Sequence, residues 1–251
     1  IVGSLGLFAI AIGTAMSLNG TAGGPTIAFA GAAAIIVMLF GWFGAVIHES
    51  VNGYYNAQVD RSFRQGMVWF IASEVFFFAA FFGALFYARQ MAVPWLAGEG
   101  NNLFTNLLLW RDYDAVWPTN GPGAVGGEFE VMRGTGLPAI NTLILLTSGV
   151  TVTIAHHALK EANRQLLNLS LGATVALGFL FVALQISEYA EAYQHMNLTL
   201  GSGIYGSTFY MLTGFHGLHV TLGAVMLLVV LLRCLKGHFS PENHFAFEAA
   251  A

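Results

Sequence analysis

The stretch GIYGSTFYMLTGFHGLHVTLGAVMLLVVLL, residues 203–232, decides the fold. It contains no Asp, Glu, Lys or Arg, and the nearest flanking charges are Glu191 and Arg233. At 1.5 Å per residue, an α-helix over this stretch is about 45 Å long, which exceeds the roughly 30 Å hydrocarbon core of a bilayer. We therefore predict a transmembrane helix that tilts in the membrane or protrudes from it.

The composition is that of a chain whose solvent is mostly lipid. Only 9% of the 251 residues are charged and 56% are hydrophobic, whereas soluble domains carry about 25% Asp, Glu, Lys and Arg. The net charge of −4 comes without a run of Lys or Arg, so we do not expect nucleic acid as a partner. Cys234 is the only cysteine, which excludes an intrachain disulfide and any metal centre that needs two cysteines.

Gaps between charged residues predict five further helices, because a charge near the middle of a bilayer costs about 2.5–3.5 kcal/mol. The chain is then an all-α, polytopic transmembrane helix bundle. The predicted helices cover residues 2–17, 27–47, 66–88, 138–158, 166–187 and 203–232. The first two helices occupy region 1–48, a cytoplasmic-side loop covers 49–65, and the main bundle covers 66–251 with an outer loop at 89–137.

The distribution of positive charge predicts how the bundle is oriented. With these spans, six cations lie on one side of the membrane and three on the other. The six are Arg61, Arg64, Lys160, Arg164, Arg233 and Lys236, and the three are Arg89, Arg111 and Arg133. The positive-inside rule places the side with six cations in the cytoplasm or matrix.

Glu74 is the most informative single residue. It lies about eight residues, or roughly 12 Å, inside the predicted third helix. A carboxyl at that depth is neutral or paired, and intramembrane acids mark proton relays. The alternative is a structural role, in which a protonated Glu74 donates a hydrogen bond to a neighbouring helix. Both roles stay open at this point.

Histidines are the other residues that could carry chemistry. His216 and His219 are three residues apart on one helix face and could in principle bind a metal or haem, but two histidines are a weak signal. His156 and His157 are adjacent, so they point about 100° apart. We assign these four, and Glu188 near the outer end of the fifth helix, to polar contacts at helix interfaces, and we predict no metal site and no catalytic residue.

Five stretches between residues 66 and 250 carry a family resemblance when they are taken together and in order. They are GMVWFIASEVFFF at 66–78, LPAINTLILLTSGVTVTIAHHAL at 137–159, LQISEYAEAY at 184–193, YGSTFYMLTGFHGLHVTLG at 205–223 and HFAFEAA at 244–250. In these strings the chain resembles subunit III of haem-copper cytochrome c oxidase. The resemblance extends over most of the chain from Glu49 onward.

The resemblance implies a non-catalytic core subunit of a proton-pumping complex that reduces dioxygen with electrons from cytochrome c. It implies packing on subunit I, a neighbouring subunit II, and support of proton uptake, with haem A and copper in the partner subunits and no cofactor in this chain. A respiratory supercomplex with a cytochrome c reductase stays open. Glu74 matches the buried carboxyl of the family's third helix.

The resemblance also implies bound phospholipid. In the family, the first two helices and the other five form two bundles, and the cleft between the bundles holds lipids. Glu49, Arg233, His238 and His244 match positions near the headgroups of those lipids. The family continues after FEAA into a seventh helix, so six of its seven helices are expected here. The outer loop 89–137 is longer than in mitochondrial members, which favours the plasma membrane of a bacterium over the mitochondrial inner membrane.

Two alternative functions remain open from the sequence. One is a stand-alone proton channel or transporter that uses Glu74, because an acid so deep in an apolar helix marks an ion pathway. The other is subunit III of a related quinol oxidase, which differs in its electron donor. The chemistry of this chain does not separate the second alternative from a cytochrome c oxidase, because neither redox centre would contact the chain.

Overall fold

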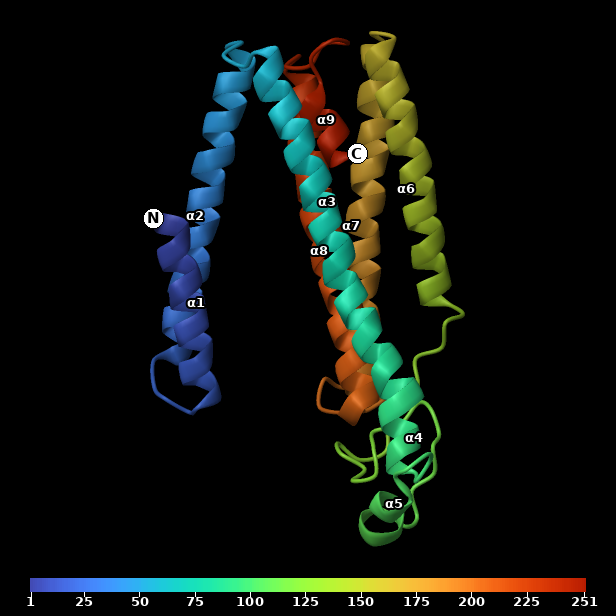
Figure 1. Ribbon diagram of the computed structural model, residues 1–251. Helices are drawn as coiled ribbons and strands as arrows, with labels where there is room; N and C mark the ends of the chain where they lie inside the picture. The colour runs from blue at the N-terminus through green and yellow to red at the C-terminus, as the bar shows by residue number, and fades with distance from the viewer. The chain divides into compact units, whose positions relative to one another are not determined.

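The computed structural model describes residues 1–251, and every regular element in it is helical (Figure 1). The elements are α1 (Val2–Leu18), α2 (Gly24–Val51), α3 (Ala57–Tyr87), the π-helical turn η1 (Ala88–Ala92), α4 (Val93–Leu96), α5 (Leu103–Leu109), α6 (Leu137–Lys160), α7 (Arg164–His195), α8 (Gly203–Leu235) and α9 (Phe245–Ala250). The chain forms two compact units, Ile1–Phe63 and Arg64–Ala251. The predicted fold class, an all-α polytopic helix bundle, is confirmed.

Five helical stretches are long and apolar enough to cross a membrane. They are Gly24–Val51, Ala57–Leu96, Leu137–Lys160, Arg164–His195 and Gly203–Leu235, and α1 is an apolar helix of only 17 residues. At most 39% of any of these five spans is buried inside the chain. So much exposed apolar surface requires lipid or partner proteins around it, and the chain is an integral membrane protein.

The predicted loop 49–65 is largely helical, which corrects the sequence-based boundaries. α2 continues to Val51 and α3 begins at Ala57, so the connection is only 52–56. The start of α3 is set by Asn56, whose side-chain oxygen accepts hydrogen bonds of 3.0 Å from the backbone N–H groups of Gln58 and Val59. Such a cap satisfies donors that a helix start leaves unpaired. Counting charges missed it, because the charged first turns of α3 are helical without being apolar.

The apolar helix also continues past the predicted end at residue 88. Within η1, the N–H of Val93 bonds to the carbonyl of Ala88, a spacing of five residues instead of four. This wider turn precedes Pro94, which has no N–H to donate to the preceding turn. Helical structure therefore extends to Leu96, and the predicted outer loop 89–137 begins with helix and also contains α5.

In the first unit, α1 and α2 pack closely because glycines face each other. A Cβ added to Gly31 would lie 2.6 Å from the carbonyl oxygen of Gly6, and one added to Gly24 would lie 2.6 Å from the backbone nitrogen of Ser17. Both distances are too short for real atoms. Small residues at such positions let transmembrane helices approach until their backbones touch.

In the second unit, the largest buried cluster joins the end of α6, the start of α7 and the end of α8 with α9. Its members are Ala155, Ala158, Leu159, Leu167, Leu171, Val230, Cys234, Phe239 and Phe247. Phe247 is completely buried and is the largest side chain that this short helix packs into the bundle. Phe247 of this cluster stacks on His156, which belongs to the polar group described below.

A second cluster at the opposite end of this unit explains why α7 extends beyond its predicted end at residue 187. Ala192 is fully buried, and the hydroxyl of Tyr189 lies 2.6 Å from that of Thr213 on α8. Aromatic packing of Tyr210 against α7 continues the contact. These interhelical contacts keep residues 188–195 helical although two glutamates lie among them.

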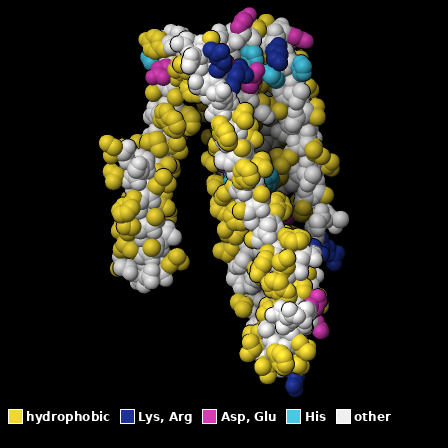
Figure 2. Space-filling view, in the orientation of Figure 1, with side chains coloured by type: hydrophobic (Ala, Val, Ile, Leu, Met, Phe, Trp, Pro, Cys, Tyr) yellow, Lys and Arg dark blue, Asp and Glu magenta, His cyan; other side chains and the backbone are white.

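Five of the eight basic residues of the second unit lie at the end where α3 enters it and where α6 and α8 finish. Figure 2 shows Lys, Arg, Asp, Glu and His side chains at that end, further charged side chains toward the opposite end, and mostly hydrophobic ones along the length of the helices. The basic residues at these helix ends are Arg64, Lys160, Arg164, Arg233 and Lys236. Which compartment this end faces stays a prediction.

Candidate functional site

Glu74 and His219 form a hydrogen-bonded pair between α3 and α8. The Nε2 atom of His219 lies 2.5 Å from Oε2 of Glu74, and its Nδ1 atom lies 2.5 Å from the backbone oxygen of Phe215. A carbonyl only accepts, so Nδ1 carries a proton. The Glu74 contact then needs one further proton, on the carboxyl of Glu74 or on Nε2. The pair therefore holds one exchangeable proton between two helices.

Aromatic rings surround this pair. The ring centroid of Phe78 is 5.2 Å from that of His219, and Phe77 and Phe215 meet edge to face at 5.0 Å. About a third of each side chain of the pair remains exposed, 32% for Glu74 and 33% for His219. An apolar surrounding strengthens a hydrogen bond and disfavours separated charges. The open side gives a partner subunit, lipid or water a route to the carboxyl.

His216 does not join this pair, although it is only three residues from His219. Its ring meets the edge of Phe181 on α7, with centroids 5.9 Å apart. The two histidines therefore contact different neighbouring helices, His216 contacting α7 and His219 contacting α3.

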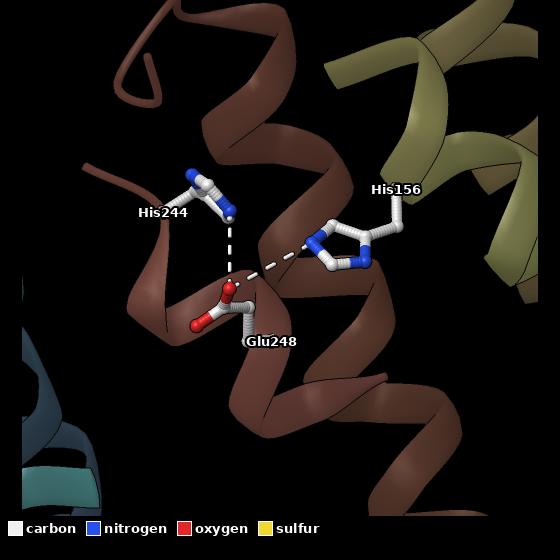
Figure 3. A group of neighbouring side chains, drawn as sticks. All are labelled: His156, His244 and Glu248. Atoms are coloured by element: carbon white, nitrogen blue, oxygen red, sulfur yellow. Dashed lines mark ion pairs between the residues drawn. The ribbon is translucent and has the colours of Figure 1, made fainter. Parts of the chain in front are cut away.

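A second polar group joins α6 to the C-terminal segment, at the end of the unit where most of its basic residues lie. Figure 3 shows His156, His244 and Glu248 directed toward one another. Oε1 of Glu248 lies 3.2 Å from Nε2 of His244 and 3.8 Å from Nε2 of His156. The other oxygen of Glu248, Oε2, accepts a 2.5 Å hydrogen bond from Arg64. The neighbouring His157 is exposed and takes no part.

The surroundings lower the pKa of the Glu248 carboxyl. Partial burial acts to raise the pKa of this carboxyl, but the hydrogen bond and charge of Arg64, together with His244 and His156, outweigh it and lower the pKa below the usual value near 4.5. Glu248 is thus held as a carboxylate. Sequence reasoning did not find it: the i,i+4 spacing of His244 and Glu248 was visible, but the approach of His156 depends on the fold.

The residues predicted near lipid headgroups have different surroundings. Arg233 is 8% exposed, its guanidinium lies 4.4 Å above the ring of Phe239, and its Nε atom has no hydrogen-bond partner. Nδ1 of His238 is also buried without a partner. His244 belongs to the polar group with Glu248. Their lipid role stays a prediction, but Arg233 has a buried N–H donor without a partner, and His238 has a buried ring nitrogen that can donate to an external anion when it carries a proton.

Glu49, the fourth residue of that set, lies in the first unit. Its Oε2 atom accepts a 2.8 Å hydrogen bond from the hydroxyl of Tyr55. Burial raises the pKa of Tyr55, and the hydrogen bond and negative charge of Glu49 raise it further. The hydrogen bond from Tyr55 to Glu49 therefore links the last turn of α2 to the connection that precedes α3.

Glu188 lies inside α7, seven residues before its last residue His195, and is 9% exposed. The sequence placed it at the outer end of a helix that ended at residue 187; because α7 is longer, this glutamate is buried among helices instead. A polar role at a helix interface stays a prediction for Glu188, as it does for the four histidines.

Comparison with known proteins agrees with the helix pattern and with the strings quoted above. The sequence profile of the family described as cytochrome c oxidase subunit III matches residues 1–99 and 101–251. A cytochrome c oxidase subunit 3 from Marchantia polymorpha is 39% identical over 252 residues, covering 100% of this chain and 84% of the relative. Those from Gallus gallus and Rattus norvegicus are 41% and 40% identical over 217 residues, covering 86% of this chain and 72% of each relative. The chain belongs to the cytochrome c oxidase subunit III family.

Proposed function

We propose that this chain is a non-catalytic core subunit that packs on the haem-bearing subunit I, next to subunit II, and stabilises it. The observation that carries this proposal is α3, none of whose 31 residues is buried within the chain. Exposed aromatic residues such as Trp69, Phe70 and Phe76 cover it. An apolar surface of this size is covered by a partner or by lipid, and haem A and copper belong to the partner subunits.

We further propose that the Glu74–His219 pair supports proton uptake into subunit I. The pair holds one exchangeable proton in an aromatic surrounding and keeps an exposed side. An acid at this depth in the membrane typically belongs to a proton pathway. The carboxyl of Glu74 and the imidazole of His219 can exchange the proton along their hydrogen bond without separating charge over a long distance.

The test uses the whole oxidase complex with Glu74→Gln, which keeps a hydrogen bond to Nε2 of His219 but cannot release a proton. We expect a lower steady-state turnover in proteoliposomes, with unchanged haem and copper spectra. Glu99→Gln in the outer loop is the control. Turnover equal to that of the unmodified complex would assign Glu74 a structural role only. Proton flux through liposomes that contain this chain alone would instead support a stand-alone channel.

A third part of the proposal is binding of structural phospholipid at the end of α8. Arg233 supplies a cation with an unpartnered Nε atom, and His238 supplies an unpartnered Nδ1 atom. A lipid phosphate offers acceptors to both. Arg233→Gln is expected to reduce the phospholipid retained per complex after mild delipidation, measured by phosphorus assay. Lys236→Gln, at an exposed cation three residues away, is the matched control and should retain lipid.

We also propose the plasma membrane of a bacterium as the location, on the basis of the long outer segment 89–137. The relatives named above come from a plant, a bird and a mammal, so the family itself is not confined to bacteria. Cell fractionation with an antibody against this outer segment would test the proposal. Recovery of the chain with mitochondria would contradict it.

A further inference from the structure

The polar group of His156, His244 and Glu248 has the geometry of a metal-binding site. One ligand atom from each residue lies within 4.8 Å of the other two (Figure 3). His156 comes from the last turns of α6. Glu248 lies in α9, and His244 is the residue just before α9. The three side chains therefore converge from segments about ninety positions apart in sequence, across one end of the bundle.

The two imidazoles are poised to bind something that the chain alone does not supply. The Nε2 atoms of His156 and His244 are both buried and have no hydrogen-bond partner. The side chain of His244 is only 9% exposed. Its Nε2 atom is 3.2 Å from Oε1 of Glu248, yet it makes no hydrogen bond there. Buried polar atoms without partners are uncommon, and each points to an unfilled interaction.

The opposite nitrogen of His244 fixes its tautomer. Nδ1 lies 3.2 Å from the backbone oxygen of Ser240, to which it donates. The lone pair of the neutral ring is then on Nε2, which faces Glu248. Metal-binding histidines usually show this arrangement, with one nitrogen on the metal and the other N–H on a carbonyl or carboxylate.

Glu248 has a corresponding division between its two oxygens. Oε2 is held by Arg64, which leaves Oε1 directed at the two imidazoles. The guanidinium orients the carboxylate in the same way that outer hydrogen bonds orient metal-binding carboxylates. Its positive charge, with that of Lys160 one turn from His156, also opposes a cation. We therefore expect moderate rather than very tight binding.

We propose that Nε2 of His156, Nε2 of His244 and Oε1 of Glu248 bind one Zn²⁺ ion, with water in the fourth position. Two imidazoles and a carboxylate suit Zn²⁺, whereas Mg²⁺ and Ca²⁺ prefer oxygen ligands only. Zinc bonds of about 2.0–2.2 Å place the ligands of a tetrahedral site roughly 3.4 Å apart. The present separations of 3.2 and 3.8 Å to Oε1 are close to that value.

Binding would connect α6 with α9. Phe247 already fixes this short helix from below, and its ring stacks on that of His156 with centroids 5.6 Å apart. A metal above the ring would add a second point of attachment. The ion would therefore stabilise the C-terminal segment against the bundle and would take no part in electron transfer.

The experiment uses the purified oxidase complex, stripped with a chelator and dialysed against ⁶⁵Zn²⁺. We expect the unmodified complex to bind one zinc ion more than the His244→Ala and Glu248→Gln complexes at low micromolar zinc. Removing a ligand should lower the affinity at this site at least about 100-fold, because loss of even an outer-shell partner costs 10–100-fold. His157→Ala, which removes the adjacent but exposed imidazole, is the matched control and should bind like the unmodified complex.

A second measurement does not depend on how the variants fold. The zinc X-ray absorption of the reloaded complex, minus that of the His244→Ala complex or of the stripped unmodified complex, should contain two imidazole nitrogens at about 2.0–2.1 Å. Equal zinc content in the unmodified and His244→Ala complexes would overturn the proposal. A difference spectrum without imidazole scattering would overturn it as well.

Discussion

Glu248 contacts, through its two carboxylate oxygens, three residues that are distant in sequence from one another. Arg64 holds one oxygen, and His156 and His244 face the other. Both partners of the Arg64 ion pair are partly open to solvent, with 48% and 27% of their side chains exposed. Such pairs contribute less than about 1 kcal/mol, so the structural value of Glu248 lies in bringing α3, α6 and α9 together rather than in the strength of one contact.

The pH dependence of stability should reveal this carboxylate. Arg64 and the histidines lower the pKa of Glu248 in the folded chain. Its stabilising contribution is therefore present above the unfolded value near 4.5 and is lost as the pH falls through the lower folded pKa. Thermal unfolding of the complex from pH 7 downward should show a smaller acid-induced loss for Glu248→Gln. Glu242→Gln, at an exposed carboxyl in the same segment, should behave like the unmodified complex.

Substitutions of Glu74 and of His219 should change the stability of the complex by different amounts. Glu74→Gln keeps a hydrogen bond to Nε2, so we expect the thermal stability of the complex to change by less than about 1 kcal/mol. His219→Leu leaves the carboxyl of Glu74 without its partner, and an unsatisfied polar group costs about 1–3 kcal/mol. Differential scanning calorimetry of the two complexes measures the difference. Equal destabilisation by both changes would contradict the hydrogen bond.

Helix packing in the first unit depends on glycines spaced seven residues apart. Gly6 and Gly13 recur on one face of α1, as Gly24 and Gly31 do on α2, because seven residues make almost two turns. Gly31→Val should separate the two helices and destabilise their contact by about 1–3 kcal/mol. Gly41→Val on the same helix, where a Cβ meets no atom within 4 Å, should be tolerated. The two variants are compared by thermal unfolding of the complex, in which the temperature at which the α1–α2 region unfolds is measured.

The helices themselves could be predicted from the gaps between charges, but their ends could not. Apolar composition marks the part of a helix in lipid and says nothing of turns that continue into water. The side chain of Asn56 sets the start of α3, and the π-helical turn before Pro94 extends its end. The extension of α7 to His195 depends on contacts with Thr213 of α8. Each boundary therefore rests on hydrogen bonds or packing that the hydropathy pattern does not contain.

The polar residues likewise include some that the sequence predicts and some that only the fold brings together. Glu74 was identifiable because an isolated acid in an apolar helix is conspicuous in any sequence. Its partner His219 was visible only as one of two spaced histidines, since the contact with α3 comes from the fold. The cluster around Glu248 joins residues from α6 and α9 that no local pattern connects. Sequence thus indicates which residues need partners, and the arrangement of helices in the second unit decides which partners they receive.

The orientation of the second unit follows from its charges and can be tested with cysteine labelling. The native Cys234 is buried at 3% exposure, so this subunit gives a low background. Glu161→Cys, beside Lys160, should react with a membrane-impermeant maleimide from one side of the membrane only. That side is the cytoplasm or matrix, where the positive-inside rule places this end of the unit. Asn101→Cys, exposed after α4, should react only from the opposite side. Labelling right-side-out and inverted vesicles and measuring modification of this subunit separates the two cases, and the reverse pattern would contradict the predicted orientation.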